Sequence, residues 1–175
     1  MKEIKIPTFL HEVLGEKQSL IEIVSTLLFA LIGSLVILQL ADFTLEQWTS
    51  VLAFILIVDV LAGCVANFTQ GTNNFYAARA KNRLIFIVIH VHLLVIAWLL
   101  DASLINATII WAYTIIGAFI VNALKGKRLQ HFIAANLLCY GVLIAISLSM
   151  PSWLLIVSVF FMMKVLYSFA VDYYA

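Results

Sequence analysis

The sequence predicts an all-α integral membrane protein, a bundle of six transmembrane helices. Of its 175 residues, 65% are hydrophobic and only 11% are charged, whereas a soluble domain has roughly a quarter of its residues charged. Six apolar runs each approach the length of about 20 residues that a helix needs to cross a bilayer. Lysines and arginines gather in alternate connections between these runs, as expected for a chain that crosses a membrane repeatedly.

The six spans are expected to be helical because backbone amides and carbonyls in lipid must hydrogen-bond one another. Ser19 and Glu22 have the spacing of a capping box that begins the first helix. We expect residues 20–175 to form a single transmembrane domain, preceded by a cytoplasmic segment of residues 1–19. The predicted spans cover residues 20–40, 46–67, 84–100, 105–123, 129–149 and 152–171.

Basic residues set the expected orientation. They lie before the first span, after the second and after the fourth, and the other three connections contain no lysine or arginine. By the positive-inside rule both termini are cytoplasmic, and we expect the bacterial cytoplasmic (plasma) membrane as the location. The basic residues are Lys2, Lys5, Lys17, Arg79, Lys81, Arg83, Lys125, Lys127 and Arg128.

Residues 8–18 have the pattern of a short amphipathic helix. Its apolar residues share one face, and its charged residues lie largely off that face. We expect this helix to lie on the surface of the inner leaflet; the alternative is a soluble extension of the first helix. The apolar face comprises Phe9, Leu10, Val13 and Leu14.

Ionisable side chains within a span are costly, so each is a candidate functional residue. Together with one amide, four of them lie roughly 9–12 Å from the inner ends of their spans, counting about 1.5 Å per residue. One polar site in the cytoplasmic half would explain this common depth. We expect Asp59 and Lys164 to pair there; a purely structural ion pair is the alternative. The predicted buried polar site comprises Asp59, His90, His92, Asn136 and Lys164.

His90 and His92 are two residues apart, which places their side chains about 200° apart on a continuous helix. Both could bind one metal ion only if the helix were broken, so the sequence predicts no metal site and leaves the cofactor unknown. A metal or haem bound through His90, His92 or His131 is the alternative, for which the ligand geometry is poor. We expect His90 to face the interior of the bundle. For His92 a structural or lipid-edge position is the more favoured interpretation.

A segment rich in amides and hydroxyls follows the second span on the predicted cytoplasmic side. Gly71 allows a tight turn within it. Such groups, with guanidinium groups nearby, are suited to a lipid headgroup or a phosphate; an ordinary loop is the alternative. The candidate binding residues are Asn67, Thr69, Thr72, Asn73, Asn74, Tyr76, Arg79 and Arg83.

Three classes of function fit these patterns, and whether the chain is an enzyme stays open. It binds or transports a small molecule, ion or lipid through the buried polar site, with proton coupling as a hypothesis because histidine is the side chain whose ordinary pKa lies near neutral pH. Alternatively, it is a membrane-embedded enzyme acting on a lipid-linked substrate at the cytoplasmic face, with His90 or Asp59 as general base. A structural or partner-binding bundle is the third class.

The expected partners are the lipid bilayer and a small-molecule or lipid ligand. No basic face suited to nucleic acid is present, and oligomerisation is possible. Polar residues are sparse in the outer half of the predicted bundle, which weakens the case for transport and strengthens that for an enzyme. They are mainly Tyr113, Thr114, Ser147 and Ser149.

Overall fold

A computed structural model describes residues 3–174 of the chain, so Lys2 lies outside the described residues. Six spans are long and apolar enough to cross a membrane, which confirms the predicted helical membrane fold. Their ends fall within a few residues of the predicted ones. The spans are α2 (Leu20–Ala41), α3 (Trp48–Ala66), α5 and α6 (Ala80–Ile89 and His92–Leu99), α7 (Leu104–Ala123), α8 (Gln130–Ser147), and α9 and η2 (Ser152–Met162 and Met163–Phe169).

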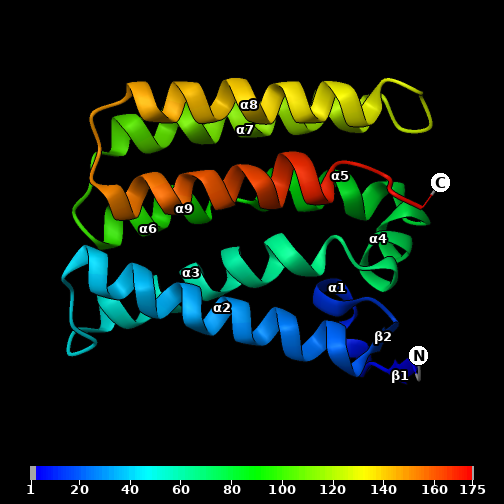
Figure 1. The fold of residues 1–175 in the computed structure, drawn as a ribbon, viewed down its shortest axis with the longest axis horizontal. Coiled ribbons are helices and arrows are strands. Elements are labelled where there is room, and N and C mark those ends of the chain that lie inside the picture. Colours follow the sequence, from blue (N-terminus) through cyan, green and yellow to red (C-terminus); the bar gives the residue numbers. More distant parts are fainter. Residues whose placement is uncertain (1–2, 175) are drawn as a thin grey trace.

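The sixth span lies at the centre of the bundle. In Figure 1, α9 runs between the α2–α3 pair and the α7–α8 pair. Together, α9 and η2 pack against α2, α3, α7 and α8, and this span is the most deeply buried of the six. Because of this central position, a charged side chain on the sixth span can be kept away from lipid.

Both termini lie at one end of the bundle, as six crossings require (Figure 1). The short helix α4 (Gln70–Ala77) lies at the same end. We call this the inner end, because the distribution of lysine and arginine predicts that it faces the cytoplasm. The orientation in the membrane is still a prediction.

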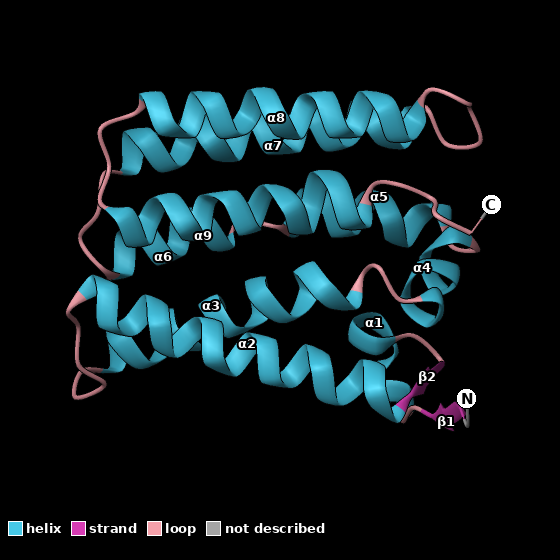
Figure 2. Ribbon diagram, in the orientation of Figure 1, coloured by secondary structure: helices cyan, strands magenta, loops and turns pink. Residues whose placement is uncertain are grey.

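The N-terminal segment differs from the single helix predicted over residues 8–18. Its helical part ends at Gly15, which has a left-handed φ of 70°. The chain then extends into a short strand that pairs antiparallel with the first strand (Figure 2). The position of this segment on the inner leaflet stays a prediction. The segment consists of β1 (Glu3–Lys5), η1 (Thr8–Leu10), α1 (His11–Leu14) and β2 (Lys17–Ser19).

Two glycines allow the N-terminal segment to lie against α4. A Cβ atom on Gly15 would overlap the backbone of Gly71, and one on Gly71 would overlap the Lys17 carbonyl oxygen. The predicted capping box then begins α2: the Ser19 hydroxyl accepts from the Glu22 amide, and the Glu22 carboxylate accepts from the Ser19 amide at 2.7 Å. The second half of the segment is therefore held against α4 and the start of α2.

The third span is broken between α5 and α6. His90, with φ −76° and ψ 75°, is the centre of an inverse γ-turn in which the Val91 amide donates to the Ile89 carbonyl at 2.8 Å. The Trp111 indole N–H donates to the His90 carbonyl oxygen at 2.9 Å. This bond satisfies a carbonyl that the break removes from the helical ladder, as the apolar surroundings require.

Candidate functional site

A buried ion pair joins the second and sixth spans near the inner end. Lys164 Nζ lies 2.6 Å from Asp59 Oδ2 and also donates to the Asp59 carbonyl oxygen at 3.2 Å. The Lys164 side chain is 3% exposed, whereas 42% of the Asp59 side chain is not covered by the chain. The pair predicted from the sequence is therefore present, and part of the carboxylate is free for a further contact.

Two local features accommodate the Lys164 side chain. Lys164 belongs to η2, a π-helical stretch, and π-helical turns occur frequently at functional sites. Asn67 Nδ2 and Ser168 Oγ donate to the backbone carbonyl oxygen of Lys164 at 3.2 and 3.0 Å. On the facing helix, a Cβ atom on Gly63 would overlap Lys164 Cε. A glycine on α3 is thus what lets the lysine reach Asp59.

The break in the third span brings the two histidines together. Their ring centroids are 5.0 Å apart, so the prediction that they point about 200° apart is wrong. It assumed a continuous helix, and the γ-turn at His90 ends that continuity. His92 Nε2 lies 3.5 Å from Asp59 Oδ2. His92 therefore joins the ion pair instead of lying at the lipid edge, and His90 is buried as predicted.

The partners of each imidazole indicate which ring nitrogen carries hydrogen. His90 Nδ1 is bonded to the Phe86 carbonyl oxygen, which only accepts, so Nδ1 donates and a neutral ring keeps its lone pair on Nε2. His92 Nε2 faces a carboxylate, which leaves the lone pair of its neutral ring on Nδ1. That Nδ1 atom is buried without a hydrogen-bond partner among the described residues.

These groups line a cavity of about 150 Å³, called the Asp59 cavity below. It has room for a few water molecules or a small polar group and is smaller than the roughly 300–1,000 Å³ of sites for drug-sized ligands. Val13 of α1 and Ile89 of α5 also line it, and both are exposed. The polar side chains of the lining are Glu12, Asp59, Asn67, His90, His92 and Lys164.

Glu12 is the residue of this cavity that the sequence reasoning missed. The Tyr76 hydroxyl donates to the Glu12 carbonyl oxygen at 2.9 Å and holds α1 over the cavity. Burial raises the pKa of the Tyr76 hydroxyl, and the Glu12 carboxylate raises it further, so the hydroxyl stays protonated and remains a donor. The sequence contains no signal that would place residue 12 against the second and sixth spans.

Asn136 does not join the Asp59 cavity. Its Nδ2 donates to the Phe132 carbonyl oxygen of its own helix at 2.8 Å. Its helix, α8, packs mainly against α7, α9 and η2. A similar depth in the membrane was therefore not enough to predict that this side chain shares the site.

The amide-rich segment after α3 forms α4 instead of a loop. Thr69 caps this helix by accepting from the Thr72 amide. Asn73 Nδ2 donates to the Val171 carbonyl oxygen at 3.0 Å, and Gln18 Nε2 donates to Thr69 Oγ1 at 2.8 Å. These polar groups connect α4 to both ends of the chain. The buried members of the predicted headgroup site are Asn67, Thr69, Thr72, Asn73, Tyr76 and Arg83.

Arg83, predicted to hold a headgroup, is 1% exposed inside the bundle. Its Nε donates to Asn122 Oδ1 at 3.0 Å, and its Nη2 donates to the Ala170 carbonyl oxygen at 2.9 Å. Gln130 Nε2 donates to the same carbonyl at 3.1 Å. Arg83 thus donates to a backbone carbonyl at the end of the sixth span and does not face the membrane surface.

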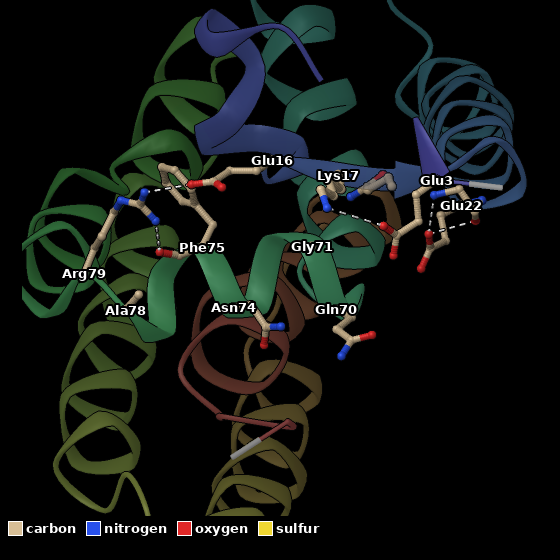
Figure 3. Close-up of a pocket in the computed structure, with 12 residues that line it drawn as sticks. Glu3, Glu16, Lys17, Glu22, Gln70, Gly71, Asn74, Phe75, Ala78 and Arg79 are labelled. Carbon is tan, nitrogen blue, oxygen red and sulfur yellow. Dashed lines mark hydrogen bonds and ion pairs between the residues drawn. The ribbon is translucent and has the colours of Figure 1, made fainter. Parts of the chain in front are cut away.

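Arg79 and Asn74 line a hollow of about 630 Å³ at the inner end (Figure 3). Arg79 binds Glu16 Oε1 at 2.8 Å and also donates to the Phe75 carbonyl oxygen at 2.8 Å. Lys17 lies 3.9 Å from Glu3. Because both cations of this hollow already face a carboxylate, the hollow is poorly suited to a phosphate.

Within residues 3–174, no group of three or more His, Cys, Asp or Glu side chains is arranged to hold a metal ion. Comparison with protein families, with curated proteins and with solved structures finds no match for the chain. The chemistry of the Asp59 cavity is therefore the observation that bears most directly on function.

Proposed function

We propose that this chain binds a small polar solute in the Asp59 cavity, takes it up from the inner side and transports it across the membrane. The break at His90 is the observation that carries this proposal. Backbone that leaves the helical conformation at membrane depth is tolerated where it is buried in protein or lines a cavity. Broken helices form the solute sites of many transporters, and here the break lies beside a buried ion pair.

Proton coupling is the second part of the proposal. The titratable groups of the cavity come from α1, α3, the break between α5 and α6, α6 itself, and η2. Protonation of an imidazole or a carboxylate changes the charge of the lining, and therefore its affinity for a charged solute. The groups concerned are Glu12, Asp59, His90, His92 and Lys164.

Proton flux in liposomes tests the transport proposal. With a pH-sensitive dye inside and an imposed pH gradient, liposomes containing the chain should take up protons faster than protein-free liposomes. Asp59→Asn should lower the rate to the protein-free level, because it removes the carboxylate at the centre of the cavity. Glu46→Gln, at an exposed carboxylate between α2 and α3, should leave the rate unchanged. Equal rates for Asp59→Asn and the unmodified chain would overturn the proposal.

A membrane-embedded enzyme is the second candidate, and the outer half of the bundle favours it. The Tyr113 hydroxyl donates to the Leu137 carbonyl oxygen at 2.6 Å, and Thr114 Oγ1 donates to the Ile110 carbonyl oxygen at 2.7 Å. Ser147 Oγ also donates within its own helix. These side chains are satisfied internally and offer little lining for a path outward. A site reached from one side suits a lipid-linked substrate, with His90 or Asp59 as general base.

A further inference from the structure

We infer that the ligand of the Asp59 cavity carries a primary ammonium group. This inference rests on the proposed function, namely that the cavity binds a small polar solute. It follows from the hydrogen-bonding groups that the lining leaves open, from the charge of the lining, and from the size of the cavity.

The open groups of the lining are acceptors. Asp59 uses Oδ2 for both Lys164 and His92, and no described residue donates to its Oδ1. The Nε2 atom of neutral His90 carries a lone pair, because the Nδ1 atom of that ring faces the Phe86 carbonyl oxygen. The corresponding Nδ1 atom of His92 is buried and does not open into the cavity. Glu12, an exposed residue of the lining, brings a further carboxylate.

The donors of the lining are directed at the protein itself. Lys164 Nζ donates twice to Asp59. Asn67 Nδ2 donates to the Lys164 carbonyl oxygen, and the Tyr76 hydroxyl donates to the Glu12 carbonyl oxygen. A ligand that brings donors therefore finds more open partners in this lining than one that brings acceptors. An ammonium group has three N–H donors and no acceptor, so it complements this lining.

The charges of the lining point to the same class of ligand. With neutral imidazoles, the Asp59 carboxylate and the Lys164 ammonium compensate each other, and Glu12 adds one more carboxylate as an exposed residue of the lining. The lining then has one more negative than positive charge, which favours a cationic ligand. A ligand with a single positive charge restores neutrality, whereas a carboxylate or phosphate would increase the imbalance.

The size and the rim of the cavity limit the rest of the ligand. A volume of about 150 Å³ admits an ammonium group with a short carbon chain. The exposed side chains of Val13 and Ile89 make the rim apolar. A free small amine and the ethanolamine headgroup of a lipid share the required chemistry, and binding in membranes with and without that lipid distinguishes them.

Equilibrium binding of radiolabelled methylammonium to the full chain tests the inference. In nanodiscs of phosphatidylcholine and phosphatidylglycerol, we expect saturable binding that ethylammonium displaces and that sodium acetate at equal concentration does not. Glu12→Gln should weaken the affinity about tenfold, the effect expected for the loss of one charge contact. Glu46→Gln, which removes a carboxylate distant in sequence and outside the lining, is the matched control and should bind as the unmodified chain does.

The outcomes separate this inference from the proposed function. Weaker methylammonium binding after phosphatidylethanolamine is added would support the ammonium class with lipid as the source, and unchanged binding would support a free amine. Absence of saturable methylammonium binding would overturn the inference, as would displacement by acetate. In either case proton flux that depends on Asp59 would leave the proposed function standing. Asp59→Asn combined with Lys164→Met removes both charges of the ion pair and should abolish binding in a chain that still folds.

Discussion

Asp59→Asn is expected to destabilise the folded chain by about 3 kcal/mol, because removing one partner of a buried ion pair leaves the other charge uncompensated. That other charge is Lys164, whose side chain is 3% exposed in the centre of the bundle. Among the described residues, the ammonium donates only to Asp59, so the variant leaves it without its anion. Reversible unfolding in mixed detergent micelles measures this difference in free energy.

Two controls separate the effect of burial from that of a lost carboxylate. Glu16→Gln breaks the exposed pair with Arg79, whose atoms are 2.8 Å apart, and should cost less than about 1 kcal/mol. The double variant Asp59→Asn with Lys164→Met should recover most of the lost stability, because no buried charge is then left without its partner. Equal losses for Asp59→Asn and Glu16→Gln would contradict the described burial of Lys164.

Gly63→Ala is expected to destabilise the chain by about 2 kcal/mol, within the range for overpacking a tight interior. The added Cβ would overlap Lys164 Cε, so the ammonium would have to move away from Asp59. Gly33→Ala is the matched control on a neighbouring span. There the Cβ would lie 2.9 Å from Leu61 Cδ1, the end of a flexible side chain that can rotate away.

The same unfolding measurement checks the Gly63 prediction, and proton flux provides a second readout. Gly63→Ala should lower the flux because it displaces a charge of the site, whereas Gly33→Ala should not. Equal stability losses for the two alanine variants would show that Gly63 has no special relation to Lys164.

The spans were predictable because lipid imposes a strong constraint: each crossing needs a long apolar run that satisfies its own backbone. The pairing of Asp59 with Lys164 was predictable for a related reason, since a charge at membrane depth needs a partner. The break at His90 was not predictable, because no proline or glycine marks it. Without the break, the helical period places His92 on the wrong side of its helix.

The role of the amide-rich segment was not predictable from its composition. Asn73 and Tyr76 were interpreted as ligand-binding groups, and the structure uses them to bind backbone carbonyls of residues 171 and 12. Amides and hydroxyls serve both purposes equally well. Whether they bind a ligand or the backbone depends on where the N-terminal segment and the last helix lie in the fold. No local sequence pattern predicts those positions.

The reactivity of a cysteine at position 89 tests the central claim. That claim is that the Asp59 cavity is a polar site open to water from the inner side. Ile89→Cys lies at the rim of the cavity, whereas Ile116→Cys lies on α7 away from it; the isoleucines are 58% and 61% exposed. Ile116 is about 10 Å from the inner end of its span, the same depth as Asp59. Both variants are made in a chain whose own cysteines are replaced, Cys64→Ala and Cys139→Ala.

The reagent is a charged methanethiosulfonate that does not cross membranes, applied to the inner side in vesicles of known orientation. Only a hydrated thiol ionises and reacts. We therefore expect Ile89→Cys to react about tenfold faster than Ile116→Cys, or more, and methylammonium to slow the reaction at residue 89 only. Equal, slow reaction of both cysteines would contradict a water-accessible site at the broken third span.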